Sequence, residues 1–205
     1  MSALTARDAA ALERCLRGGG VAVFPADTVY GLCCDPDDVA AVRRLYELKG
    51  RPAEKPAAVM FFVLGEALRV IGEDELAAAR ALLPGPVTLL VPNRGRRFLP
   101  ACGPDPETLG LRVPALPAQL AALHGVRAPL MQSSANLSGA GEARRLGEVP
   151  ESLREQADLV LDGGELPGTP STVVDLRGWA ADRRWRIVRE GAISGRALAH
   201  ALKDA

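Results

Sequence analysis

The sequence predicts a single α/β domain, residues 1–205, built on one open, twisted sheet of mixed strand direction with a concave ligand-binding face. Short apolar runs alternate with helical patterns along the whole chain, which is typical of this class. Two connections, 91–109 and 176–185, show no helical pattern, so we expect a mixed rather than a fully parallel sheet. Glycine and proline number 21 and 16, more than an average domain contains, so many connections should be tight.

The first helix is expected to begin at Thr5. Thr5 and Asp8 resemble a capping box in which Asp replaces the usual Glu. The three glycines at 18–20 should end this helix. They are not interpreted as a phosphate-binding loop, because such a loop is followed by a helix and here a strand is expected at 21–24. Periodicity of 3.6 predicts further helices at 38–48, 73–83, 117–124, 150–156 and 194–203, the last capped by Ser194. Short apolar runs predict further strands at 57–63, 87–91, 109–113, 129–132, 159–161, 171–176 and 185–188.

Composition excludes several classes of function. The 25 Lys and Arg balance the 25 Asp and Glu, which argues against a nucleic-acid coat or a membrane-surface protein. Four cysteines without C-x-x-C spacing, and only two histidines, argue against a transition-metal site. No apolar run approaches the roughly 20 residues that cross a bilayer. We therefore expect a soluble, cytoplasmic protein with no membrane contact.

Six polar clusters lie just past the ends of predicted elements, where open α/β sheets bind ligands. They are residues 25–31, 49–52, 108–114, 132–139, 171–175 and 189–191. In the second cluster, Gly50 separates Lys49 from Arg51, so both cations could face one phosphate chain. The same cations could instead complement the dipole at a helix C-terminus.

Strand alternation places Thr108, Gly110 and Arg112 on one face. Arg112 could there reach a carboxylate or phosphate, or it could lie at a solvated strand end. Ser134 and Asn136 offer neutral hydrogen-bonding groups, or form an ordinary turn. The sequence contains no G-x-S-x-G elbow, P-loop or G-x-G-x-x-G fingerprint, and offers no convincing general base. Together the clusters predict anion handling by positioning and electrostatics, without a covalent nucleophile.

In this order, the clusters resemble the threonylcarbamoyl-AMP synthase family, which has the YrdC-type fold. The resemblance rests on residues 25–32, 49–52 with 55–56, 84–89, 110–114, 134–139, 171–175 and 189–191. It extends over about 21–193, and the pairing of K-x-R with S-x-N is specific. The chain is similar to the short, single-domain form of the family.

The resemblance implies a reaction and its partners. Members of the family make L-threonylcarbamoyl-AMP from L-threonine, bicarbonate or CO2, and ATP, and release pyrophosphate. Proteins that take up this intermediate use it to modify the tRNA adenosine next to the anticodon, and the resemblance allows a weak direct contact with tRNA. Mg²⁺ would arrive with ATP, so neither a protein metal site nor an organic cofactor is expected.

The resemblance also implies roles for individual residues. Lys49 and Arg51 would be catalytic, and removing either charge is expected to slow turnover with little effect on stability. The threonine-binding residues would be Thr28, Arg112, Ala135 and Ser171, with Arg112 on the carboxylate. The nucleotide-binding residues would be Lys49, Arg51, Thr108, Ser134, Asn136 and Arg189.

Three departures from the family pattern limit this transfer. Ala26 replaces the usual Thr, and Met60 stands where some members carry a His near threonine. Residues 140–145 do not resemble the usual Pro- and Ser/Thr-rich continuation, so no ATP contact is transferred to them. Three alternatives compete with this interpretation. The first is an RNA-binding module of the same fold, and the second is a carbamoyl-transferring relative of the hydrogenase-maturation type, which normally carries additional zinc-finger and acylphosphatase regions. The third is an inactive paralogue, against which the intact Lys49, Arg51, Ser134 and Asn136 argue.

Overall fold

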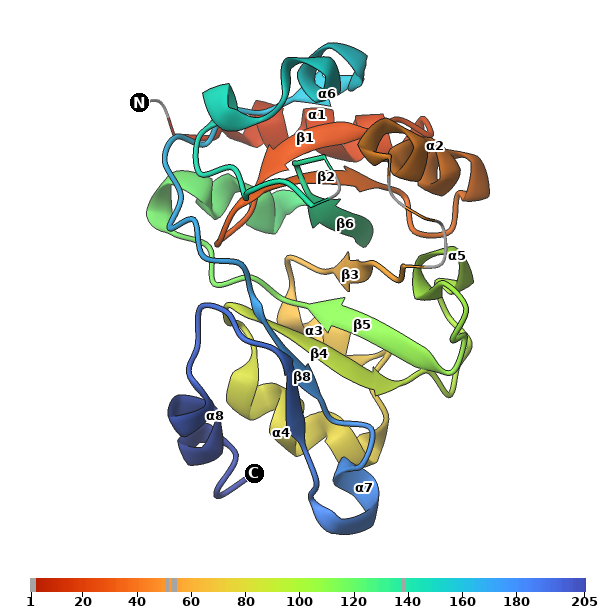
Figure 1. The fold of residues 1–205 in the computed structure, drawn as a ribbon, viewed down its shortest axis with the longest axis vertical. Coiled ribbons are helices and arrows are strands. Elements are labelled where there is room, and N and C mark those ends of the chain that lie inside the picture. The colour runs from red at the N-terminus through yellow and green to blue at the C-terminus, as the bar shows by residue number, and fades with distance from the viewer. Residues whose placement is uncertain (1–2, 51, 53–54, 138) are drawn as a thin grey trace.

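The computed structural model describes residues 3–50, 52, 55–137 and 139–205. Within these residues, a nine-stranded sheet runs in the order β7-β1-β2-β6-β3-β5-β4-β8-β9 (Figure 1). The strands are β1 (Ala22–Pro25), β2 (Tyr30–Cys34), β3 (Ala58–Met60), β4 (Val87–Pro92), β5 (Thr108–Arg112), β6 (Leu130–Ser134), β7 (Leu159–Val160), β8 (Thr172–Asp175) and β9 (Arg186–Arg189).

The strand directions confirm a mixed sheet. Parallel pairs join β1 to β7, β3 to β5 and β4 to β8. The other neighbours pair antiparallel. Chain order and sheet order differ strongly, so residues far apart in sequence meet across the middle of the sheet.

Helices cover the sheet at both of its ends (Figure 1). The α-helices are α1 (Ala6–Arg17), α2 (Val39–Lys49), α3 (Leu64–Leu68), α4 (Leu76–Leu82), α5 (Leu99–Cys102), α6 (Glu151–Gln156), α7 (Trp179–Asp182) and α8 (Gly195–Ala201). Three 3₁₀ segments, η1 (Glu73–Glu75), η2 (Ala118–Gly125) and η3 (Leu146–Glu148), complete the set for the described chain. One continuous apolar core runs between the sheet and these helices.

Two predicted helix starts are confirmed by their caps. The hydroxyl of Thr5 accepts a hydrogen bond from the Asp8 amide, and the Asp8 carboxylate accepts one from the Thr5 amide at 2.7 Å. At α8, the Ser194 hydroxyl accepts from the Ala197 amide at 3.3 Å. Each cap satisfies an amide that the first turn of a helix leaves without a partner, so local sequence alone fixes these boundaries.

Other predicted elements need correction. The two connections expected to lack helices contain α5 and α7, four-residue helices that are too short to give a periodic signal. The expected helix at 117–124 is the 3₁₀ segment η2, and the strand expected at 57–63 is limited to β3. Strand β2 was not predicted. All five of its residues are buried, so it lacks the alternation that identifies a half-exposed strand.

Candidate functional site

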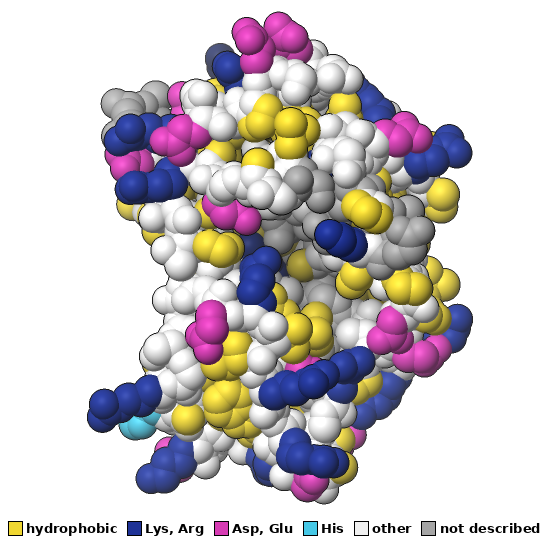
Figure 2. Space-filling model, viewed as in Figure 1, with side chains coloured by type: hydrophobic (Ala, Val, Ile, Leu, Met, Phe, Trp, Pro, Cys, Tyr) yellow, Lys and Arg dark blue, Asp and Glu magenta, His cyan; other side chains and the backbone are white. Residues whose placement is uncertain are grey.

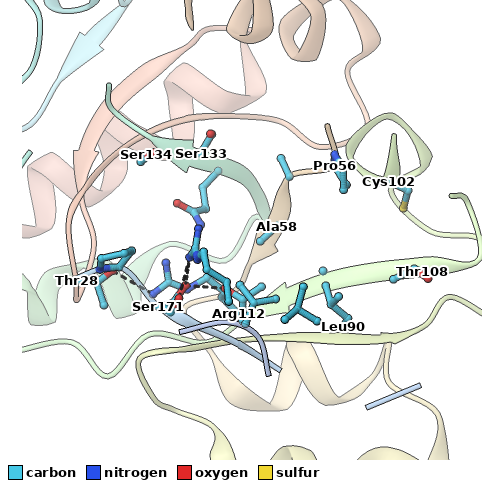
Figure 3. A pocket seen from close by; sticks show the side chains of 18 of the residues that line it. Thr28, Pro56, Ala58, Leu90, Cys102, Thr108, Arg112, Ser133, Ser134 and Ser171 are labelled. Atoms are coloured by element: carbon cyan, nitrogen blue, oxygen red, sulfur yellow. Dashed lines mark hydrogen bonds between the residues drawn. The ribbon is translucent and has the colours of Figure 1, made fainter. Parts of the chain in front are cut away.

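A cavity of about 420 Å³ opens on the middle of the sheet, where Figure 2 shows the surface hollowed between the two ends of the molecule. Thr28 and Thr108 lie at opposite ends of this cavity in Figure 3, with Ser133 and Ser134 on one wall and Ser171 and Arg112 on another. The polar side chains that line it are Thr28, Thr88, Asp105, Thr108, Arg112, Gln132, Ser133, Ser134, Glu142, Ser171, Arg177 and Arg189. The cavity is thus elongated and carries polar groups at both ends.

Arg112 ends β5 with its guanidinium buried against the carboxylate of Asp27. Its Nη2 donates to Asp27 Oδ1 at 2.6 Å, and both side chains are at most 3% exposed. Burial lowers the pKa of Arg112, the Asp27 carboxylate acts in the opposite direction, and the positive charge of Arg189 lowers it again. The Nε atom of Arg112 is buried and has no hydrogen-bond partner among the described residues. The guanidinium of Arg112 therefore keeps one N–H group whose capacity to donate is not used by the described residues.

Thr28 lies in the connection between β1 and β2, beside Arg112. Its hydroxyl accepts a weak bond from Arg112 Nη2 at 3.4 Å, and its carbonyl accepts from the Gly168 amide at 2.8 Å. The second oxygen of Asp27 accepts from the Ala115 amide at 3.2 Å. The end of β1 and the end of β5 are therefore joined through side chains at this end of the cavity.

Ser171 directly precedes β8 and Arg189 ends β9, and the two meet beside Arg112. The guanidinium of Arg189 donates to the Ser171 carbonyl at 2.8 Å, and the Ser171 hydroxyl bonds to the hydroxyl of Thr88 at 2.8 Å. Ser171 is buried, whereas Arg189 is exposed along β9. The cavity is therefore lined here by an exposed cation with a long side chain, Arg189, and by a buried neutral hydroxyl, that of Ser171.

Thr108 occupies the other end, within a network of charges. Its hydroxyl donates to Asp105 Oδ2 at 2.7 Å and accepts from Arg177 Nη1 at 3.0 Å. Two further bonds, from Nε and Nη2, hold Arg177 on Asp175 at 2.9 and 2.8 Å. These bonds lower the pKa of Asp175 to about 2. Arg177 is consequently a fixed planar cation at this end.

Lys49 is the last residue of α2 and is only 2% exposed. Its ammonium donates to the Ser134 carbonyl and, at 3.2 Å, to Asn136 Oδ1. The Ser134 hydroxyl donates to the same Asn136 oxygen at 2.6 Å. Loss of Lys49 was expected to leave stability nearly unchanged. Its removal would take a donor from both oxygens, although Asn136 Oδ1 would keep the Ser134 hydroxyl, so these contacts favour a loss of stability instead.

The structure thus brings most of the predicted site residues together. Thr28, Thr108, Arg112, Ser134, Ser171 and Arg189 line the cavity. Lys49 and Asn136 form hydrogen bonds with Ser134 but do not themselves line the cavity. Ala135 is buried and bonds through its amide to the Tyr30 carbonyl at 2.8 Å, again outside the cavity lining. Arg51, and Ser138 of the segment 134–139, lie outside the described residues.

Sequence reasoning missed three charged residues at the site. Asp27 stood inside the first cluster, but nothing in the sequence indicates that it faces Arg112. Arg177 follows the cluster 171–175 and was read as part of a connection. Glu142 belongs to the segment where the family pattern ends, so no family role pointed to it. In each case the missing information was which strand neighbours which.

The described residues contain no group of three or more His, Cys, Asp or Glu side chains that could hold a metal ion. No helix in the described chain is long and apolar enough to span a membrane.

Comparison with known proteins gives a consistent result. The model of the Sua5/YciO/YrdC family, described as "Telomere recombination", matches residues 14–191. A threonylcarbamoyl-AMP synthase of Pyrococcus abyssi is 33% identical over 168 residues, which cover 80% of this chain and 49% of that protein. A threonylcarbamoyl-AMP synthase of Xanthomonas campestris is 36% identical over 169 residues, covering 79% of this chain and 89% of that one.

Among solved structures, P. abyssi Sua5 complexed with L-threonine superposes with a TM-score of 0.81 at 28% identity. The match covers 97% of this chain and 58% of that one. The chain therefore spans about half the length of the P. abyssi relative and most of the length of the Xanthomonas relative.

Proposed function

Because this chain belongs to the Sua5/YciO/YrdC family, we propose that it is a threonylcarbamoyl-AMP synthase. In this proposal it joins L-threonine, bicarbonate or CO2, and ATP into L-threonylcarbamoyl-AMP and releases pyrophosphate. The observation that carries the proposal is the convergence of Thr28, Arg112, Ser171 and Arg189 on one cavity, with Thr108 and Arg177 at its other end. One elongated cavity can hold two substrates end to end.

Threonine would occupy the end formed by Arg112, Thr28 and Ser171. The unpartnered Nε of Arg112 supports this placement, because a buried guanidinium donor is satisfied well by a carboxylate. The hydroxyls of Thr28 and Ser171 can bond to the threonine side chain or backbone. Ala135 would act through its backbone position beside Tyr30, since its methyl group does not line the cavity.

The nucleotide would extend toward Thr108, passing Ser134 and Arg189. Arg189 reaches the open side of the cavity from β9 and can contact phosphate oxygens. Lys49 would support this region by fixing the loop from Ser134 to Asn136 and by adding positive charge behind it. We retain Arg51 as a proposed phosphate ligand on the K-x-R resemblance alone.

The proposed chemistry needs positioning and charge stabilisation. The threonine nitrogen is first carboxylated, and an oxygen of the resulting carbamate then attacks the α-phosphate of ATP. Fixed cations such as Arg189 would offset the charge that develops on the departing pyrophosphate. Mg²⁺ would enter with ATP, coordinated by phosphate oxygens and water, and would neutralise part of that charge.

Further partners follow from the proposed product. A mixed carbamoyl–phosphate anhydride is reactive, so a protein that transfers it to tRNA must take it up promptly. We propose that this transfer occurs in the cytoplasm, and that any direct contact of this chain with tRNA is weak, given the balanced overall charge.

The test is pyrophosphate release by the purified chain, with threonine, bicarbonate and ATP each omitted in turn. Release that requires all three supports the proposal, and mass spectrometry should identify the adenylate product. ATP hydrolysis independent of threonine, or turnover with carbamoyl phosphate in place of threonine and bicarbonate, would contradict it. RNA binding without any turnover would favour a binding module of the same fold.

A further inference from the structure

Glu142 occupies a fixed position on the wall of the cavity. The carbonyl of the next residue, Ala143, accepts from the Tyr30 amide at 2.9 Å, which ties this segment to the start of β2. The carbonyl of Arg144 accepts from the Leu166 amide at 2.9 Å, and its amide donates to Glu148 at 2.7 Å. The backbone beside Glu142 is therefore held on several sides, and its half-buried side chain lines the cavity.

The carboxylate of Glu142 has an unused acceptor. Its Oε2 is buried and has no hydrogen-bond partner in the described part of the chain. Asp105, the other acid lining the cavity, differs because it already accepts from Thr108 and Arg177. A buried carboxylate oxygen without a donor is costly unless a ligand supplies one. Glu142 therefore brings to the cavity wall a buried carboxylate oxygen whose capacity to accept a hydrogen bond is not used by the described residues.

Arg112 provides the complementary group. Its buried Nε is a donor without a partner among the described residues, and Arg112 lines the same cavity as Glu142. A cationic donor and an anionic acceptor match the carboxylate and the ammonium of an α-amino acid. A nucleotide phosphate does not match this pair, because Glu142 would repel it.

We propose, resting on the proposed function, that Glu142 binds the substrate ammonium and accepts its proton when the nitrogen is carboxylated. The nitrogen forms its bond to the carbon of CO2 only after losing a proton, since an ammonium has no lone pair. R–NH3⁺ and CO2 give R–NH–COO⁻ and two protons. Glu142 takes the first, and the second leaves from the carbamate nitrogen to solvent. With bicarbonate, water leaves as well and one net proton is released.

The role of Glu142 predicts a specific loss in Glu142→Gln. At pH near 7, kcat/KM for threonine should fall about 10²- to 10³-fold, the usual contribution of a positioned proton acceptor. The KM for ATP should stay within about threefold. The deficit should shrink as the pH rises toward about 9, because free amine then supplies the nucleophile without help. The control Glu151→Gln makes the same chemical change on an exposed residue of α6 and should match the wild type.

Calorimetry separates binding from turnover. Glu142→Gln should weaken L-threonine binding about ten- to a hundredfold. It should not weaken binding of 2,3-dihydroxybutanoate, which has the same carbon skeleton and carboxylate but a hydroxyl in place of the ammonium. Equal losses for both ligands would overturn the proposal, as would unchanged threonine binding. A changed Mg²⁺ requirement with unchanged threonine binding would instead make Glu142 a ligand of Mg²⁺.

The two proposals fail in different ways. If the wild-type chain binds threonine but releases no threonine-dependent pyrophosphate, the proposed function fails, and the binding half of this inference is still decided by calorimetry. If the wild-type chain is active and Glu142→Gln is equally active, the inference alone fails. Absence of threonine binding by the wild type would overturn both. The variant should fold, because Gln keeps the shape of Glu and Glu142 Oε2 has no hydrogen bond to lose among the described residues.

Discussion

Arg112 Nη2 lies 2.6 Å from Asp27 Oδ1, and both side chains are almost fully buried, although 85 residues separate them in the chain. The pair links the end of β1 to the end of β5 at the Thr28 end of the cavity. It also limits how Arg112 can serve a ligand, because part of its guanidinium is already used by Asp27.

Removing one partner of this pair should cost far more than removing both. Arg112→Met leaves the Asp27 carboxylate buried without its cation, and we expect a loss of about 3–5 kcal/mol in the free energy of unfolding. Adding Asp27→Asn should restore much of this loss. Urea unfolding of the two single variants and the double variant measures the coupling. Additive effects would show that solvent already satisfies the pair.

Arg112→Lys tests the ligand role with the positive charge retained. A lysine ammonium cannot supply the guanidinium Nε to the substrate while it also pairs with Asp27. L-Threonine affinity should fall about ten- to a hundredfold, and ATP affinity should change little. Titration calorimetry with each substrate decides this, and equal losses for both would assign Arg112 a structural role only.

Lys49→Met should affect both stability and turnover. The variant keeps most of the side-chain volume but leaves the Ser134 carbonyl and Asn136 Oδ1 without their shared donor. We expect a loss of about 1–3 kcal/mol in stability and a fall in turnover of about 10²- to 10³-fold. Lys203→Met, on an exposed lysine, is the control. Unchanged melting temperature and turnover would indicate that Lys49 merely ends α2.

Arg189→Ala should weaken ATP binding without unfolding the protein, because Arg189 is exposed. We expect a loss of about tenfold or more in ATP affinity, and the loss should diminish at high salt, where exposed charges are screened. Arg196→Ala, on an exposed arginine of α8, serves as the matched control. A similar effect of both variants would point to a general effect of net charge.

Asp175 should govern part of the acid stability. Its folded-state pKa of about 2 lies below the ordinary value of 3.8, because Arg177 stabilises the charged form. Its ion pairs therefore add stability above pH of about 4, and this stability is lost as the pH falls toward about 2. Asp175→Asn should cost about 1–2 kcal/mol at neutral pH and flatten the profile between these values. Asp37→Asn, on an exposed residue, should leave the profile intact.

Gly191 is predicted to be essential for the position of Ser171. A Cβ at Gly191 would lie 2.4 Å from the Pro170 carbonyl oxygen and 2.5 Å from the Ser171 carbonyl carbon, both backbone atoms. Gly191→Ala should therefore cost about 1–3 kcal/mol in stability and weaken threonine binding. Gly65→Ala meets no atom within 4 Å and should leave binding unchanged. Equal binding by both variants would contradict the requirement.

The fold could be predicted from the sequence for those features that are determined by residues close together in the chain. The caps at Thr5 and Ser194 and the strand-end position of Arg112 are local features. The burial of β2 on both faces is not, because Gly31, Cys33 and Cys34 give neither alternation nor a strong strand preference. Short helices such as α7 also fall below the length at which periodicity can be detected.

The candidate site divides in the same way. Alternation along β5 correctly placed Thr108, Gly110 and Arg112 on one cavity-facing side. The partners Asp27 and Arg177 could not be found, because sequence distance does not reveal strand neighbours. Lys49 was expected to face a ligand, and in the structure its ammonium donates to the Ser134 carbonyl and to Asn136 Oδ1. Its position depends on α2 packing beside the end of β6, which only the tertiary structure determines.

The sheet order has a consequence for synthesis of the protein on the ribosome. Strand β8 pairs with β4 through Val87 and Thr172, and β9 then pairs with β8. Ser171 and Arg189 therefore reach the cavity only after the chain has been translated beyond Arg189. Until then the nascent chain exposes the unpaired side of β4, whose residues Val87, Leu89 and Val91 are strongly apolar. Such non-local pairing folds slowly and leaves an edge open to aggregation. Growth temperature and translation rate should therefore influence the yield of active protein more than they would for a helical bundle of equal length.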